Sequence, residues 1–219
     1  MGFLKDFFKK HKKADVPALT VEDVSKLPTF SDFDLGLFWD RVTSNNLAEN
    51  EKYFEQMSSW ASDKGIQKYI CHSIPVDQLF RSFVEETDAR RRGDDRCNLY
   101  FCFNEGDDFL GAAYISAPIG QNKDSVIEYL VVNPNLQGKG IGTKMVKSIT
   151  SFADYFNNGY QSEGIYASVN SENTASLKAL LKSSFKVVSG NWTDCGKYYS
   201  VLYISKRDME NNKSVMEKE

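Results

Sequence analysis

The stretch Glu128-Tyr-Leu-Val-Val-Asn-Pro-Asn-Leu-Gln-Gly-Lys-Gly-Ile-Gly-Thr143 decides the fold. It lies in and after a run of apolar and β-branched residues over 125–132, which is typical of a central strand. A glycine-rich turn follows, and the apolar spacing over 140–156 predicts a helix. The start of a helix presents unpaired N–H groups and the positive end of its dipole, and glycines let a ligand come close. This order of strand, turn and helix predicts an anion site suited to a phosphate or diphosphate.

The spacing of the glycines excludes two better-known nucleotide motifs. Walker A requires Gly-x4-Gly-Lys-Ser/Thr, a spacing that the sequence does not contain. A Rossmann turn requires Gly-x-Gly-x-x-Gly, whereas Gly138, Gly140 and Gly142 follow Gly-x-Gly-x-Gly. The pattern that remains is Gln137-x-x-Gly140-x-Gly142.

This pattern resembles the acetyl-coenzyme A signature of the GNAT superfamily of N-acetyltransferases. Val132-Asn-Pro134 before the turn and Asn173-Thr-Ala-Ser176 at the start of a later helix are also similar to the family, and the resemblance covers about residues 66–206. It implies an α+β fold in three layers. The central sheet would be mixed and mostly antiparallel, with a splayed fourth strand and helices on its faces.

The resemblance also implies acetyl-coenzyme A as co-substrate and no metal. The pantetheine arm would pair with the backbone of the splayed strand, and the diphosphate would lie on the N–H groups of the glycine-rich turn. Lys139 would add charge or face the solvent, and Asn173 would contact the arm or cap its helix. The residues expected to bind the co-substrate are Leu130, Val131, Val132, Gln137, Gly138, Lys139, Gly140, Ile141, Gly142, Thr143, Asn173 and Ser176.

Glu128 is the candidate general base. A primary amine has a pKa of about 10.4 and is mostly protonated at pH 7, so it must lose a proton before it attacks a thioester. Regular strand alternation would place Glu128 on one face with Leu130 and Val132. The alternative interpretation is a carboxylate held at the strand by an ion pair.

One position departs from the family pattern. Many relatives carry a tyrosine seven residues after the motif asparagine, where it protonates the departing thiolate, and the corresponding residue here is Leu180. Tyr166, Tyr198 and Tyr199 are substitutes by residue type alone. The departure keeps a second function open, a non-catalytic acyl-coenzyme A-binding module with residues 1–65 as a docking arm.

Composition argues against several other classes of protein. Lys and Arg number 27 against 30 Asp and Glu, a formal charge of −3, so nucleic-acid binding is not expected. No apolar run approaches the roughly 18–20 residues that span a bilayer, and the start lacks the apolar stretch of a signal peptide. Four cysteines without a Cys-x-x-Cys pair argue against a zinc site. We expect a cytoplasmic enzyme whose acceptor is an amine of a small molecule or a protein.

Three segments are predicted along the chain: an N-terminal helical extension over 1–65, the acetyltransferase domain over 66–206, and a charged tail over 207–219. The basic amphipathic pattern of residues 1–13 suits docking on a partner or an anionic membrane, or packing on its own domain. Further elements are expected as helices over 32–62, 77–92 and 173–183, and as strands over 67–74, 99–104, 109–117, 164–170, 185–189 and 198–205.

Overall fold

One mixed sheet organises the part of the chain that the computed structural model describes, which is residues 29–32, 34–69, 74–90, 95–118, 124–156, 163–194 and 197–216. Its strand order is β1-β2-β3-β4-β5-β6-β8-β7, and every neighbouring pair is antiparallel except β5 and β6. The strands are β1 (Thr29–Asp32), β2 (Leu37–Val42), β3 (Asp95–Phe103), β4 (Phe109–Pro118), β5 (Ser125–Val132), β6 (Gly164–Asn170), β7 (Lys186–Asp194) and β8 (Lys197–Ser205).

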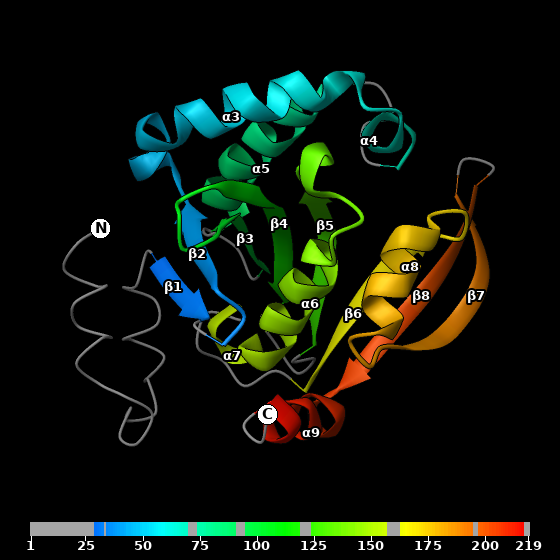
Figure 1. The fold of residues 1–219 in the computed structure, drawn as a ribbon. Coiled ribbons are helices and arrows are strands. Elements are labelled where there is room, and N and C mark those ends of the chain that lie inside the picture. The colour runs from blue at the N-terminus through cyan, green and yellow to red at the C-terminus, as the bar shows by residue number, and fades with distance from the viewer. Residues whose placement is uncertain are drawn as a thin grey trace, which may run out of the picture.

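Helices cover both faces of this sheet (Figure 1). On one face lie α3 (Glu51–Ser58), α4 (Lys64–Tyr69) and α5 (Val76–Arg90). On the other lie α6 (Ile141–Ser151), α7 (Ala153–Phe156), α8 (Thr174–Leu181) and α9 (Lys206–Met216). Short 3-10 turns connect them: η1 (Ser44–Asn46), η2 (Ala48–Asn50), η3 (Ser59–Ser62) and η4 (Pro134–Leu136). The predicted three-layer α+β fold with a mostly antiparallel sheet is confirmed.

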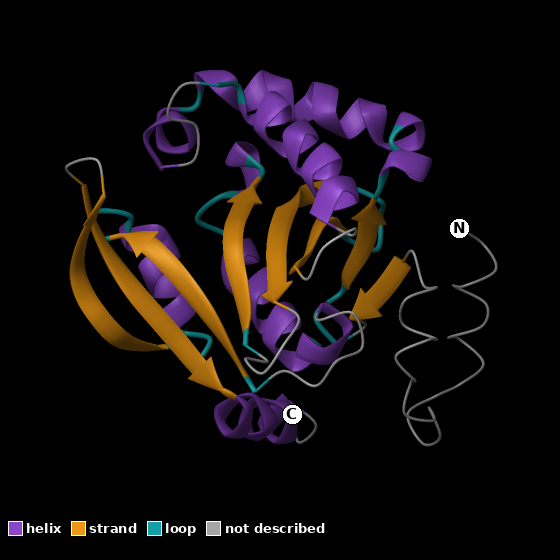
Figure 2. Cartoon of the chain, turned by 180° about the vertical axis from the view of Figure 1, so that it is seen from behind, coloured by secondary structure: helices purple, strands orange, loops and turns teal. Residues whose placement is uncertain are grey.

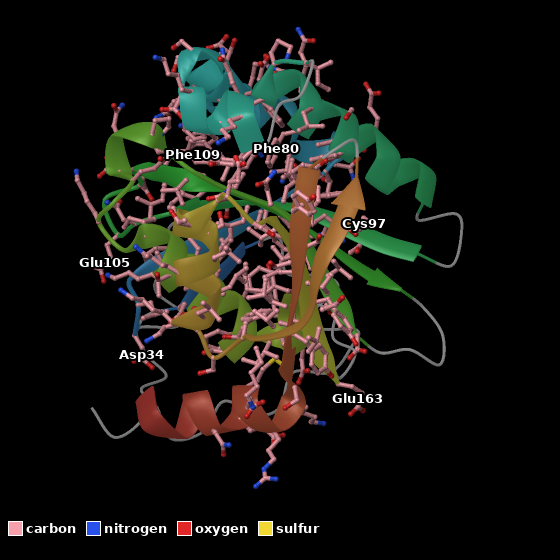
Figure 3. All side chains as sticks on the ribbon, turned by 90° about the vertical axis from the view of Figure 1, so that its right-hand side faces the viewer. Asp34, Phe80, Cys97, Glu105, Phe109 and Glu163 are labelled. Carbon is pink, nitrogen blue, oxygen red and sulfur yellow. The ribbon has the colours of Figure 1, made fainter. Side chains whose placement is uncertain are left out.

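A separate hydrophobic core fills each space between helices and sheet. The core under α3 and α5 is aromatic, and Figure 3 shows Phe80 and Phe109 between these helices and the strands. Phe109 stacks on Trp60 with ring centroids 5.5 Å apart. In the core under α6, the indole Nε1 of Trp39 donates to Ser148 Oγ at 3.1 Å, which ties β2 to α6. The two cores therefore pack against the two faces of the sheet that contains β5.

The prediction of helix from residue 32 onward is wrong up to residue 42, because β1 and β2 occupy this segment. Leu37 and Trp39 enter the core under α6, whereas Val42 enters the core under α3 and α5. Both faces of β2 therefore contribute to a core, and the apolar residues of its sequence Leu-Phe-Trp-Asp-Arg-Val show no period of two. Residues 44–62 are helical as predicted, as η1, η2, α3 and η3, and the division of the chain at residue 65 stays a prediction.

Two other predicted elements need correction. Residues 67–69 of the strand expected over 67–74 belong to α4, whose start is capped by Asp63 Oδ1 accepting from the N–H of Ile66 at 2.9 Å, and residues 70–73 lie outside the described residues. The charged tail forms α9 up to residue 216, and its Met209 is buried in the core. The strands predicted over 125–132 and 164–170 are confirmed residue for residue. The amphipathic pattern of residues 1–13 lies outside the described residues.

Candidate active site

The site begins where β5 and β6 separate. The two parallel strands pair at Ser125↔Ile165, Val126↔Tyr166 and Ile127↔Ala167, and their pairing ends there. Figure 2 shows β6, β8 and β7 turning away from the rest of the sheet beyond this point. The splayed fourth strand expected from the sequence is therefore present, as the strand β5.

The gap is lined on one side by backbone groups of β5. The N–H of Asn133 donates to the carbonyl oxygen of Leu110 at 2.8 Å, next to the pair Gly111↔Val132. Because alternate residues of an antiparallel strand bond to the neighbour, Leu130 and Val132 turn their N–H and C=O groups away from β4 and toward the gap. The side-chain amide of Gln137 donates to the carbonyl oxygen of Val132 at 3.3 Å.

The glycine-rich turn follows β5 and leads into α6. Gly138 and Gly140 have φ angles of +75° and +81°, in the left-handed region that favours glycine. A Cβ placed on either residue would have no described atom within 4 Å, so the turn faces open space. The first backbone bond of the helix runs from the N–H of Lys144 to the carbonyl oxygen of Gly140 at 3.0 Å. The N–H groups of 141–143 therefore precede the bonded part of the helix.

The other candidate binding residues around this turn differ in how far they are exposed to solvent. The N–H of Gln137 donates to Pro134 O at 3.3 Å, so this backbone donor is engaged. Lys139 is exposed, and Ile141 and Thr143 are half-buried. Gly142 packs closely on β5, since a Cβ there would lie 3.5 Å from Val132 Cγ2.

Helix α8 starts beside the open end of the gap. The Asn173 side chain caps it, with Oδ1 accepting from the N–H of Ser176 at 3.1 Å. Asn170, at the end of β6, accepts from the N–H of Glu172 at 2.9 Å and shapes the turn before the helix. Leu180, at the family's tyrosine position, is 5% exposed and belongs to the core.

Glu128 is the extra residue of a bulge in β5. Tyr129 pairs with Tyr114 and Ile127 with Ile115, so Glu128 has no partner on β4. Its Oε1 accepts a hydrogen bond from Ser116 Oγ at 2.7 Å. Ser116 lies two residues after Tyr114, whose ring belongs to the core under α3 and α5. The carboxylate is therefore on the α3–α5 side of the sheet.

This position corrects the expected alternation. Leu130 and Val132 pack against the core under α6, on the opposite face from Glu128. The expectation that the three residues share one face is wrong, because the bulge adds a residue and reverses the alternation after it. The carboxylate thus lies on the α3–α5 face, whereas the backbone groups of Leu130 and Val132 point in the plane of the sheet toward the gap.

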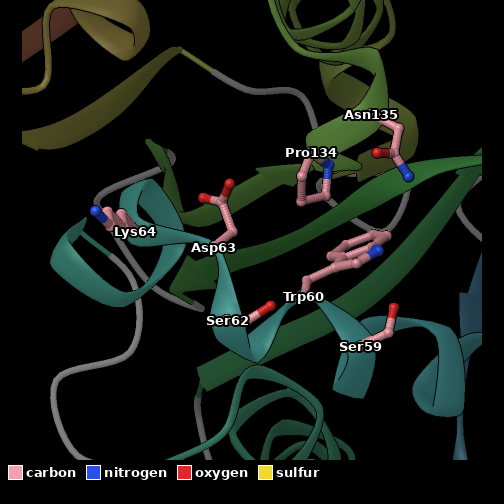
Figure 4. A pocket seen from close by; sticks show the side chains of 7 residues that line it. All are labelled: Ser59, Trp60, Ser62, Asp63, Lys64, Pro134 and Asn135. Atoms are coloured by element: carbon pink, nitrogen blue, oxygen red, sulfur yellow. The ribbon is translucent and has the colours of Figure 1, made fainter.

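Helix α4 reaches across from the α3–α5 side to the turn after β6. The Tyr69 hydroxyl donates to the carbonyl oxygen of Glu172 at 3.1 Å, and Lys68 Nζ lies 2.7 Å from the Glu172 carboxylate. Next to α4 is a hollow of about 510 Å³ (Figure 4). Its walls are Ser59, Trp60, Ser62, Asp63, Lys64, Pro134 and Asn135. No local pattern in the sequence indicates this bridge, because it joins the Tyr69 side chain to the backbone of a residue 103 positions away.

The three tyrosines proposed by type occupy different settings. Tyr166 packs on Tyr203 with ring centroids 4.5 Å apart. Tyr203 donates to Asp124 Oδ1 at 3.4 Å, and burial followed by the nearby Asp124 charge raises the pKa of its hydroxyl. Tyr198 is 60% exposed, and Tyr199 pairs with Asn170. Among the described residues, no three His, Cys, Asp or Glu side chains form a group that could hold a metal, and no helix is long and apolar enough to cross a membrane.

Solved structures of other proteins share this fold. A spermidine N-acetyltransferase from Vibrio cholerae, solved with CoA and spermine, matches with a TM-score of 0.57 at 12% identity over 80% of this chain and 99% of that chain. The aminoglycoside acetyltransferase AAC(6')-Ib, solved with coenzyme A, matches with a TM-score of 0.58 at 13% identity over 80% and 98%. A GNAT-family acetyltransferase from Bacillus anthracis gives 0.58 at 16% identity over 78% and 96%.

At these identities the likeness shows the fold alone. No curated protein sequence matches the chain significantly. The family itself is shown by sequence, because the model of the acetyltransferase (GNAT) domain matches residues 41–186, about two thirds of the chain. The chain therefore belongs to the GNAT acetyltransferases, a family of acyltransferase enzymes.

Proposed function

We propose that this enzyme transfers the acetyl group of acetyl-coenzyme A to a primary amine. The observation that carries the proposal is the end of β5–β6 pairing after Ile127↔Ala167, directly before the glycine-rich turn. One strand thus supplies unpaired backbone groups for an extended arm and leads into a helix start for a diphosphate. These two features match the two chemically distinct parts of coenzyme A.

The described residues fit the co-substrate. Open space beside Gly138 and Gly140 leaves room for phosphate oxygens, and the N–H groups of 141–143 are the donors at the helix start. The backbone of Leu130 faces the gap and would pair with an amide of the pantetheine arm. We propose the binding set Leu130, Val131, Val132, Gln137, Gly138, Lys139, Gly140, Ile141, Gly142, Thr143, Asn173 and Ser176.

We assign the general base to Glu128. The amine nitrogen forms a C–N bond to the acetyl carbon while the C–S bond breaks and its electron pair leaves with sulfur. The amine proton passes to the Glu128 carboxylate, directly or through water. A thiol has a pKa of about 8.5, so its thiolate is a tolerable leaving group and water can protonate it without the family's tyrosine.

The acceptor would approach from the α3–α5 side. Both Glu128 and the hollow beside α4 lie on this side, opposite the core that Leu130 and Val132 contact. Two compared enzymes are named for spermidine and for aminoglycosides, which are amines. We propose an amine acceptor here as well, on a small molecule or a protein.

Release of thiol from acetyl-coenzyme A with a panel of amines tests the proposal. We expect turnover with at least one amine, and a loss of about 10²–10⁴-fold in kcat for Glu128→Gln with coenzyme A affinity unchanged. Glu105→Gln, an exposed glutamate in the turn between β3 and β4, is the matched control and should behave as wild type.

A different outcome would select the alternative. Coenzyme A binding without turnover on any amine would indicate a non-catalytic acyl-coenzyme A-binding module. The observation that favours this alternative is the buried Leu180 at the position of the family's proton donor. An active Glu128→Gln variant would instead leave the enzyme assignment intact and overturn the assignment of the base.

A further inference from the structure

We propose that Ser116 is a positioning residue that orients the Glu128 carboxylate for proton transfer. The inference rests on the proposed function and adds a residue that the sequence does not single out. Ser116 lies on β4, twelve residues before Glu128, and joins it through the 2.7 Å bond from Oγ to Oε1.

The bulge creates the need for such a partner. A residue in a regular strand has its direction fixed by the pleat and by the residue opposite it. Glu128 has no opposite residue on β4, and the pairing with β6 ends at Ile127. Its side chain is also exposed, so packing does not fix its rotamer. The hydroxyl of Ser116 supplies the missing constraint.

The bond also distinguishes the two oxygens of the carboxylate, because Ser116 Oγ donates to Oε1. With Oε1 held by the hydroxyl, Oε2 remains available to receive the proton of the amine. Among the described residues, no ion pair competes with this bond for the Glu128 carboxylate, so the hydroxyl sets its direction.

The other groups on this side are aromatic. Tyr129 follows Glu128 on β5 and pairs with Tyr114 on β4. Tyr166 lies on β6 and pairs with Val126. Helix α5 contributes Phe83, which stacks on Tyr114 with ring centroids 4.1 Å apart. Asp124, at the start of β5, bonds to Tyr203 instead. In the described part of the chain, the hydrogen bond to Glu128 comes from the Ser116 hydroxyl and not from one of these rings.

A matched pair of variants tests the role. Thr and Val have nearly the same shape, so Ser116→Thr keeps the hydroxyl and Ser116→Val removes it with similar packing. For Ser116→Val we expect kcat to fall roughly tenfold at neutral pH with the KM for the amine unchanged, because the carboxylate is misdirected while the acceptor site is intact. Ser116→Thr should keep the wild-type kcat, and both variants should keep the wild-type affinity for coenzyme A.

The controls separate this inference from the function that it extends. Ser189→Ala removes an exposed hydroxyl from β7, far from the site, and should leave kcat unchanged. If Glu128→Gln is inactive while Ser116→Thr and Ser116→Val share the wild-type kcat, Glu128 is the base and the role of Ser116 is overturned. If Glu128→Gln is fully active, both assignments fall together. Circular dichroism and coenzyme A affinity establish that each variant is folded.

Discussion

The Tyr69 hydroxyl donates to the carbonyl oxygen of Glu172 at 3.1 Å and joins α4 to the turn between β6 and α8. This turn also carries the Asn173 cap of α8. The bond therefore holds the helical layer on one side of the sheet to the far side of the β5–β6 gap. The neighbouring pair between Lys68 and Glu172 is exposed on both partners and contributes little by itself.

Removing this bond should loosen the wall beside the gap. For Tyr69→Phe we expect the KM for acetyl-coenzyme A to rise about two- to fivefold with kcat unchanged, because a less fixed site pays more entropy on binding. Steady-state kinetics with the best amine of the panel measures this. Tyr53→Phe, on α3 and away from β6 and α8, is the control. An unchanged KM would show that the bridge has no part in binding.

The glycine at the start of α6 should affect binding more than stability. Gly140→Ala puts a Cβ in the left-handed region, at a cost of about 1–2 kcal/mol in unfolding free energy. The same methyl would enter the open space that we assign to phosphate oxygens, so we expect coenzyme A affinity to fall at least tenfold. Isothermal titration calorimetry measures the affinity.

Gly36→Ala is the matched control for this variant. Gly36 has a φ of +63° in the turn between β1 and β2, so it carries similar backbone strain away from the gap. We expect a comparable loss of stability with wild-type affinity for coenzyme A. Equal affinities for both variants would contradict a diphosphate at Gly140.

A side chain at Gly111 should lower the free energy of unfolding. An alanine Cβ there would collide with the carbonyl oxygen of Val131 and lie 3.1 Å from Val132 Cα, both on β5. For Gly111→Ala we expect a loss of roughly 1–3 kcal/mol in unfolding free energy, because backbone cannot move aside without breaking the β4–β5 pairing. Urea unfolding checks this, with Ser189→Ala as the control. A variant as stable as wild type would refute the close approach of β4 and β5.

Asp32 should make stability depend on pH. The residue is 1% exposed, and burial raises the pKa of its carboxyl above the ordinary value of 3.8, against the opposing bonds from Ser148 and the N–H of Leu35. The folded chain therefore holds this proton more tightly than the unfolded chain. Its contribution to stability is complete below the ordinary value and is lost as the pH rises through the folded pKa.

Asp32→Asn removes this titration. We expect the melting temperature of wild type minus that of the variant to become smaller from about pH 4 to about pH 7. The reason is that the unfolded wild-type chain loses the Asp32 proton in this range, whereas the folded chain must either keep it or ionise a buried carboxyl. Thermal unfolding followed by circular dichroism at both pH values measures the difference. A difference that stays constant across this range would show that Asp32 is not the responsible group.

The sequence was sufficient for elements whose signals are local. The sequence Asn-Glu-Gly-Asp-Asp over 104–108 indicates the turn after β3, and Asn104 Oδ1 accepts there from the N–H groups of Gly106 and Asp108, each at 2.9 Å. The glycine-rich turn was visible for the same reason, because left-handed φ angles select glycine. Such features depend on neighbours in the chain.

What could not be predicted depends on distant partners. The bulge at Glu128 arises from its pairing with β4, so a single strand sequence carries no mark of it. The bond from Ser116 follows from that bulge and was missed with it. The strand β2 was taken for a helix because cores cover both its faces and hide the period of two.

A crystal structure of the protein with coenzyme A tests the central claim most directly. We expect the diphosphate on the N–H groups of the turn that starts at Gly138, the pantetheine arm between β5 and β6, and its sulfur close to Glu128. A coenzyme bound on another surface, or a gap filled by side chains with the turn at Gly140 unliganded, would contradict the claim.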